Sequence, residues 1–205
     1  LELAVRGFPS PAEHPSPDVF TAAGASAPGI TCDPDADLVA EVIKTTSDPY
    51  VGRLSLVRVF SGTLRPDASV HVSGHFASFF GEESGHPDHD EDERIGALSY
   101  AFGKQLVPAS HVVAGDLCAI GRLSRAETGD TLSDENKSIT LESVNFPDTV
   151  ISMSIEPKSK GDREKLGQVL SVLAREDPTF EYHTDDETQE TIIAGNVVTG
   201  EMVEE

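Results

Sequence analysis

Residues 139–195 read ITLESVNFPDTVISMSIEPKSKGDREKLGQVLSVLAREDPTFEYHTDDETQETIIAG, and this stretch decides the fold of the C-terminal part of the chain. Within it, Ile151, Met153 and Ile155 alternate with polar residues, a pattern typical of a strand with one buried face. Pro157 ends that strand, because proline has no N–H to give to a sheet. The stretch therefore opens with a half-buried β-strand.

A helix and two more strands are predicted to follow. Asp162 is the predicted N-cap, and Pro178 lies just past the expected end of the helix. One apolar stripe with spacing i, i+3, i+4, i+7 consists of Leu166, Val169, Leu170 and Leu173. The segments FEYHTD (180–185) and ETIIAG (190–195) read as strands. The order β-α-β-β is the first part of a ferredoxin-like fold, which needs another helix and strand to close.

Upstream, residues 38–132 show short apolar runs separated by turn residues and no helical stripe. Strands bounded by Gly, Pro, Asp and Ser at this spacing indicate a small antiparallel β-barrel. The runs are LVAEVIK (38–44), LSLVRVF (54–60), SVHVSG (69–74) and HVVAGDLCAI (111–120). In a strand, Arg58 would lie on the same face as Leu54 and Leu56, while Val57 and Val59 make the opposite face apolar as well. Either a bulge shifts the phase or Arg58 lies at a barrel mouth.

The N-terminal residues 9–37 contain six prolines among Ala, Gly and Ser. Proline fixes φ and removes a backbone donor, so this segment cannot sustain a long helix or a central strand. It is predicted to be an extended or poorly ordered connector.

Eight segments taken together resemble a known family. They are LES-x-x-FP (141–147), VISMSIEPKSKGDREKL (150–166), LAREDPTF (173–180), ETIIAG (190–195), DPYVGRLSLVRVFSGTL (48–64), RIGALS (94–99), AGDLCAIGRL (114–123) and TGDTL (128–132). Taken in chain order, they are similar to the second and third domains of the ribosomal translocases, the elongation factor G family. The resemblance runs from about Asp35 to Gly195. It implies the end of a G domain with a linker (1–35), a β-barrel domain II (36–138) and a truncated ferredoxin-like domain III (139–205).

The nucleotide-binding motifs of such a GTPase are missing from this sequence. The only Gly-Lys pair, Gly103-Lys104, is followed by Gln105 rather than Ser or Thr, and no glycine stands at the spacing that a phosphate-binding loop requires. The opening LELAVRGFPSPAEHP resembles the last helix of the family's G domain and its proline-rich exit. We therefore expect an excised fragment that neither binds nor hydrolyses GTP alone. GTP and magnesium, the cofactors of the parent protein, would bind the absent G domain.

Composition limits the partners. The formal charge of −21 argues against non-specific nucleic-acid binding and against DNA, because phosphate affinity needs a positive surface. No apolar run approaches the roughly 20 residues of a membrane helix. Cys32 lies in a polar segment and Cys118 in an apolar run, which disfavours a disulfide framework. These features predict a cytoplasmic protein without a membrane partner.

The loop HFASFFGEESGHPDHDEDER (75–94) carries histidine and carboxylate side chains that together could bind a metal ion. The Asp-x-Asp-x-Asp of residues 88–92 departs from a calcium loop, because Glu93 stands where glycine is needed and Ser99 where a bidentate glutamate is needed. The favoured interpretation is an acidic, solvated hairpin loop between two barrel strands. No metal site and no catalytic nucleophile constellation is therefore predicted.

Basic residues carry the remaining functional signal, because Arg and Lys position phosphates without reading sequence. The resemblance implies that Arg53 and Arg58 of the barrel and Lys158 and Lys160 of the EPKSK segment contact ribosomal RNA. For each of them, a salt bridge within this acidic chain is the competing interpretation. The resemblance also implies an interdomain surface made of Arg175, Glu176 and Asp177 beside the 161–175 helix.

The function expected from this resemblance is ribosome binding and interdomain coupling within an elongation factor G-like translational GTPase. Its partners would be small-subunit RNA and protein and the parent's own G domain. Two alternatives stay open. One is a divergent paralogue acting in ribosome protection or recycling, and the other is a non-catalytic acidic binding module.

Overall fold

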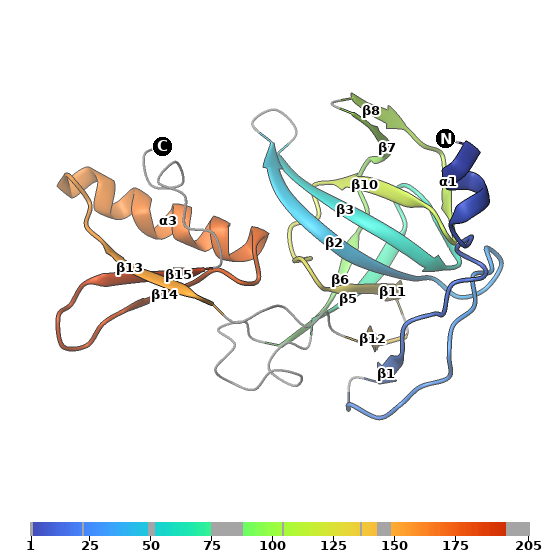
Figure 1. Ribbon diagram of the computed structural model, residues 1–205, viewed down its shortest axis with the longest axis horizontal. Helices are drawn as coiled ribbons and strands as arrows, with labels where there is room; N and C mark the ends of the chain where they lie inside the picture. The colour runs from blue at the N-terminus through green and yellow to red at the C-terminus, as the bar shows by residue number, and fades with distance from the viewer. Residues whose placement is uncertain are drawn as a thin grey trace. The chain divides into compact units, whose positions relative to one another are not determined.

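A computed structural model describes residues 2–21, 23–48, 52–74, 88–103, 105–135, 137–142 and 149–195, with the backbone alone at Ala4, Asp48, Lys160, Glu164 and Arg175. The chain divides into two compact units, unit 1 (Leu1–Ser143) and unit 2 (Val144–Glu205). Figure 1 shows the elements of each.

Unit 1 is built almost entirely from antiparallel strands. Its elements are α1 (Glu2–Gly7), β1 (Val19–Thr21), β2 (Val39–Asp48), β3 (Gly52–Ser61), β4 (Thr63–Leu64), β5 (Ser69–Gly74), β6 (His89–Arg94), β7 (Leu98–Phe102), β8 (Gln105–Pro108), β9 (Val112–Val113), β10 (Leu117–Gly121), β11 (Thr131–Asp134) and β12 (Ile139–Leu141). Eight strands form one sheet in the order β6-β5-β11-β2-β3-β10-β7-β8. Two small two-stranded sheets, β1-β12 and β4-β9, accompany it.

The predicted antiparallel β domain is confirmed, and its core lies on the inner face of the large sheet. Buried apolar side chains from most of its strands meet there, among them Val42, Val57, Val72, Ile120 and Leu132. Within the described residues the ladder does not close into a ring, because β6 and β8 are its two ends.

Strand β3 keeps a strict alternation. Val57 and Val59 are buried, whereas Leu56 and Arg58 on the other face are only partly so. One register shift lies in β2, where Ile43 is the extra residue, and the other lies in β3, where Phe60 is the extra residue. The burial alternation of β3 nevertheless continues through Arg58 to Ser61. Arg58 therefore shares a partly apolar outer face with its neighbours.

The proline-rich connector packs on unit 1. Its strand β1 pairs with β12, with Val19 opposite Leu141. These two residues are buried with Val39, and Phe60 packs against them. The segment holds no helix between residues 9 and 37, Ala22 lying outside the described residues, and this small apolar cluster gives it an ordered path.

Unit 2 has the predicted β-α-β-β order. Its elements are β13 (Ile151–Ile155), α3 (Lys160–Glu176), β14 (Glu181–Thr184) and β15 (Thr191–Gly195), and the sheet order is β13-β15-β14. The predicted N-cap is wrong, since Ser159 holds that position and its Oγ accepts from the Asp162 N–H at 3.3 Å. Asp162 instead sits in the first turn, where its Oδ2 accepts from the Ser159 hydroxyl at 2.6 Å.

The predicted apolar stripe is correct except at one residue. Leu170 is buried against Phe180 and Ile193, and Leu166, Leu173 and Ala174 pack around them. Val169, assigned to the stripe from its spacing, is 47% exposed. The buried face is therefore centred on Leu170 and turns toward Ala174 rather than Val169.

Truncating Leu170 to Ala should destabilise unit 2 by about 2–5 kcal/mol, because it removes a buried side chain and leaves a cavity. Val169→Ala is the matched control and should change stability by less than about 1 kcal/mol, because the side chain is half exposed and alanine favours helix. Hydrogen exchange of the β15 amides measures both. Equal effects would contradict the assigned helix face.

Candidate functional site

Arg53 stands at the start of β3 and is held by the connection that follows β10. Its Nη1 donates to the Ser124 carbonyl at 2.7 Å, and its own carbonyl accepts from the Arg122 N–H at 2.9 Å. Glu93 of β6 fixes the same connection by accepting from the Ser124 N–H and hydroxyl at 2.5 and 2.8 Å. Arg53 therefore anchors residues 122–124, and part of its guanidinium is engaged inside unit 1.

Arg58 lies on the opposite face of β3, five residues further along. It stands across from Glu41 of β2 and Leu117 of β10. Its guanidinium lies 4.7 Å from the ring centroid of Phe60, a cation–π contact. Burial raises the pKa of Glu41, and the positive charge of Arg58 offsets part of that rise. The structure thus does not bring Arg53 and Arg58 together.

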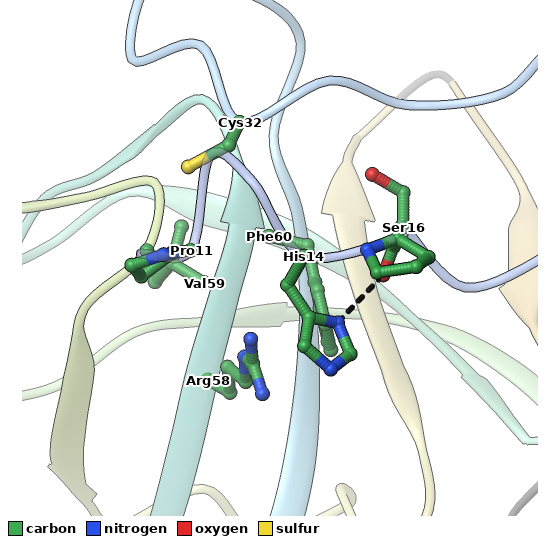
Figure 2. Close-up of a pocket in the computed structure, with 9 residues that line it drawn as sticks. Pro11, His14, Ser16, Cys32, Arg58, Val59 and Phe60 are labelled. Carbon is green, nitrogen blue, oxygen red and sulfur yellow. Dashed lines mark hydrogen bonds between the residues drawn. The ribbon is translucent and has the colours of Figure 1, made fainter. Parts of the chain in front are cut away.

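A shallow hollow lies beside Arg58, between β3 and the proline-rich connector (Figure 2). It is lined by Pro11, His14, Pro15, Ser16, Cys32, Arg58, Val59, Phe60 and Gly115. Gly115 has φ +94°, and a Cβ there would lie 3.0 Å from the ring of Pro11. A glycine is needed at this position because the connector passes so close. His14 Nδ1 donates to the Pro15 carbonyl at 2.9 Å, the dashed line in Figure 2.

In unit 2 the predicted contact residues frame α3. Lys158 is exposed just before the N-cap, and no ion pair is found for it among the residues described. Lys160 begins the helix and Arg175 lies in its last turn, but the side chains of both fall outside the described atoms. Glu176 ends the helix and is half-buried.

Asp177 has a structural role that the sequence alone did not suggest. Its N–H donates to the Leu173 carbonyl at 2.9 Å and caps α3. Its Oδ1 accepts from the Thr179 N–H and hydroxyl at 2.8 and 2.7 Å. Its carbonyl accepts from the Phe180 N–H at 3.0 Å, which directs Phe180 into the core. Residues 177–180 therefore form an internally hydrogen-bonded turn at the end of α3.

Arg122 is an exposed cation that the sequence analysis did not single out. Arg122 has φ +67°, a conformation that is uncommon and costly for a residue with a side chain. Its side chain is exposed, and no ion pair is found for it in the described part of unit 1. Nothing in the sequence marks the position, because its positive φ and its hydrogen bond to the Arg53 carbonyl arise only in the folded structure.

Histidine and carboxylate side chains meet on β5, on β6 and just before β11. His71 contacts Asp90 and Asp92, and His89 Nε2 lies 2.9 Å from Asp130 Oδ2. Burial raises the pKa of Asp130, although the contact with His89 opposes that effect. No group of three or more potential metal ligands occurs in the described residues. The solvated loop predicted at 75–94 is wrong for residues 89–94, which form the strand β6 paired with β5. His75 and His86 of that loop lie outside the described residues.

Two further observations concern chemistry and location. Burial, with the nearby charge of Asp116, raises the pKa of the Cys118 thiol to about 12, so this group is protonated and unreactive at neutral pH. In the described part of the chain, no helix is long and apolar enough to span a bilayer.

Comparisons with known proteins match both units. A family model described as Elongation factor G domain 2 covers residues 37–135, and one described as Elongation Factor G, domain III covers residues 146–202. A solved structure from Thermus thermophilus has a TM-score of 0.67 and 24% identity, covering 95% of this chain and 25% of that one. That likeness shows the fold.

Curated relatives align with nearly the whole chain. An "Elongation factor G-like protein" of Mycobacterium tuberculosis is 58% identical over 195 residues, 94% of this chain and 27% of the relative. "Elongation factor G" of Chlamydia trachomatis is 37% identical over 195 residues, 95% of this chain and 26% of the relative. The chain thus spans about a quarter of the length of the curated relatives that it matches.

Arg53→Gln should destabilise unit 1 by about 1 kcal/mol or more, because the Ser124 carbonyl loses a charged donor. Arg122→Gln is the matched control and should change stability by less than about 0.5 kcal/mol, since its side chain is exposed. Thermal melting of the two variants measures the difference. A loss no larger for Arg53→Gln than for Arg122→Gln would contradict the anchoring role.

Proposed function

Because this chain belongs to the elongation factor G family, we propose that it forms the ribosome-binding and interdomain-coupling part of a translational GTPase. The observation that carries the proposal is the tandem match of the family's second and third domains to residues 37–135 and 146–202. In the proposed parent protein, GTP and magnesium bind a separate G domain, and the protein acts in the cytoplasm.

Unit 2 is proposed to contribute the coupling surface. A surface that transmits a change between domains needs rigid elements, because packed elements pass on displacement rather than absorb it. The α3 helix and the internally bonded Asp177 turn have that rigidity. We propose that Arg175, Glu176 and Asp177 at this end of α3 face the G domain. Lys158 and Lys160, at the other end of the helix, are proposed to contact RNA phosphates.

Unit 1 is proposed to anchor the factor on small-subunit RNA. Arg58 is engaged by Glu41 and Phe60, and Arg53 by Ser124. We therefore propose that these two arginines shape the RNA-facing surface more than they bind phosphate directly. The exposed Arg122, whose backbone is bonded to Arg53, is proposed as the direct contact.

Sequence identity favours one branch of the family as the second candidate. Over spans of 195 residues, identity is 58% to the elongation factor G-like protein and 37% to the elongation factor G named above. We propose an elongation factor G-like paralogue, for which ribosome protection or recycling is the alternative to translocation. A reconstituted assay that follows mRNA movement and subunit splitting in parallel distinguishes the two roles.

The deciding experiment is GTP hydrolysis by the full-length protein with and without ribosomes. Strong stimulation by ribosomes is the expected result. A hydrolysis rate that ribosomes do not change, or no hydrolysis, would contradict the proposal. Either result would favour an acidic binding module that has kept the fold.

A charge-removal series tests the proposed RNA contacts within the same full-length protein. Lys158→Gln and Arg122→Gln should each weaken ribosome binding and reduce the slope of log affinity against log salt by about one. Arg94→Gln is the matched control, because Arg94 is exposed but paired with Asp67 at 3.4 Å. Ribosome co-sedimentation over a salt series measures the slopes. Three equal slopes would exclude Lys158 and Arg122 as phosphate contacts.

A further inference from the structure

His71 of β5 contacts two carboxylates with its two ring nitrogens. Nδ1 lies 2.8 Å from Asp92 Oδ1, and Nε2 lies 3.1 Å from Asp90 Oδ1. Both carboxylates belong to β6, where Asp92 stands directly across from His71. The imidazole is largely enclosed, with its side chain 14% exposed. One ring thus bridges two positions of the neighbouring strand.

The chemistry of these two contacts fixes the charge of the ring. An ionised carboxylate only accepts hydrogen bonds, and a neutral imidazole has one N–H and one lone pair. Both contacts are therefore hydrogen bonds only when His71 is an imidazolium. Burial by itself would lower the pKa of His71, but the hydrogen bonds to Asp92 and Asp90 and their negative charge outweigh it, so the pKa lies above its ordinary value.

Asp90 extends this contact beyond β5 and β6. Its Oδ1 also accepts from the Ser73 hydroxyl at 3.1 Å and the Ser138 hydroxyl at 2.9 Å. Ser73 Oγ in turn lies 2.8 Å from Thr140 Oγ1 of β12. The imidazolium therefore stabilises a carboxylate that joins β5, β6 and the start of β12.

The other groups around His71 leave Asp90 and Asp92 as its charged partners. From β11, Ser133 stands opposite His71 and its hydroxyl donates to the Lys137 carbonyl at 2.5 Å. The nearby charges are engaged elsewhere, since Lys137 is paired with Asp37 and Asp134 accepts from the Leu38 N–H at 3.0 Å. The protonation state of His71 thus acts mainly on β6.

We propose that His71 is a proton-dependent clamp on β6, which lies at one end of the eight-stranded sheet: the protonated ring holds β6 against β5, and loss of the proton loosens it. Deprotonation turns one of the two hydrogen bonds into a contact between a nitrogen lone pair and a carboxylate oxygen. Because β6 pairs with β5 alone among the described strands, this loss falls on its attachment. The clamp is independent of the proposed ribosomal role.

The direction of the pH dependence follows from the raised pKa. A histidine whose pKa is higher in the folded state stabilises that state fully below its unfolded value, about 6.5, and the contribution disappears as pH rises through the folded value. The clamp is therefore closed in mild acid and opens as the pH rises through the raised pKa of His71, the opposite of a buried neutral histidine.

Two measurements on the 205-residue chain test the clamp. NMR titration of the His71 ring should give a midpoint above about 6.5. Hydrogen-exchange protection of the β6 amides, corrected for intrinsic exchange, should fall as the pH rises from about 6.5 to the His71 midpoint. The total fall should be about tenfold for each pH unit that separates these two values. The β3 amides serve as the internal reference and should not follow it.

Variants complete the test. His71→Gln should abolish the pH dependence of β6 protection, whereas His111→Gln, at an exposed histidine bonded to Ser110, should keep it. Asp92→Asn should lower the midpoint of the His71 titration. This variant tests the clamp if His71→Gln fails to fold. A His71 midpoint at or below about 6.5, β6 protection that does not follow it, or an unchanged midpoint in Asp92→Asn would overturn the proposal.

Discussion

The antiparallel pairing of β2 with β3 is the interaction on which unit 1 depends. These are its longest strands, and they occupy the middle of the eight-stranded order, so every other strand of that sheet is attached through one of them. The two register shifts between β2 and β3 leave the burial alternation of β3 unbroken. That alternation sends Val57 and Val59 into the core and fixes which face each arginine of β3 occupies.

The high negative charge of the chain supplies carboxylate partners for several of its exposed cations. The sequence has 36 acidic and 15 basic residues. Arg94, Arg125 and Lys137 are all paired in this way. Exposed pairs of this kind contribute little to stability, but they remove positive potential from the surface. A phosphate-binding face must therefore be built from cations that the fold separates from acidic strands, as at Lys158 and Arg122.

Hydrophobic periodicity predicted the strands and the helix well, because the buried residues of each element recur at the regular spacing of that element. It could not choose between Val169 and Ala174, since both flank Leu170 on the helix and the choice depends on where Phe180 and Ile193 lie in the sheet. The N-cap was also misassigned, because Ser and Asp are both common at that position. In the structure the two residues hydrogen-bond to each other, with Ser159 as the cap and Asp162 in the first turn. The sequence could not predict that Ser124 contacts Arg53 or that Glu41 lies beside Arg58. Ser124 is distant from Arg53 in the sequence, and Glu41 becomes a neighbour of Arg58 only through the shifted register.

The covering of the unit 2 sheet is uneven. Met153 stands opposite the buried Ile193 and shares its face, yet Met153 is 44% exposed. The helix α3 packs toward Phe180 and Ile193, and one helix about 10 Å wide cannot also cover the outer strand. The exposed apolar side chains of unit 2 include Ile151 and Met153 on β13 and Val169 and Val172 on α3. A second helix beside α3 and a strand beside β13 are the additions that complete a ferredoxin-like arrangement, and the exposed flank of Val169 is where such a helix would pack. The spacing that assigned Val169 to a buried stripe thus fits the completed fold better than the three strands and one helix described.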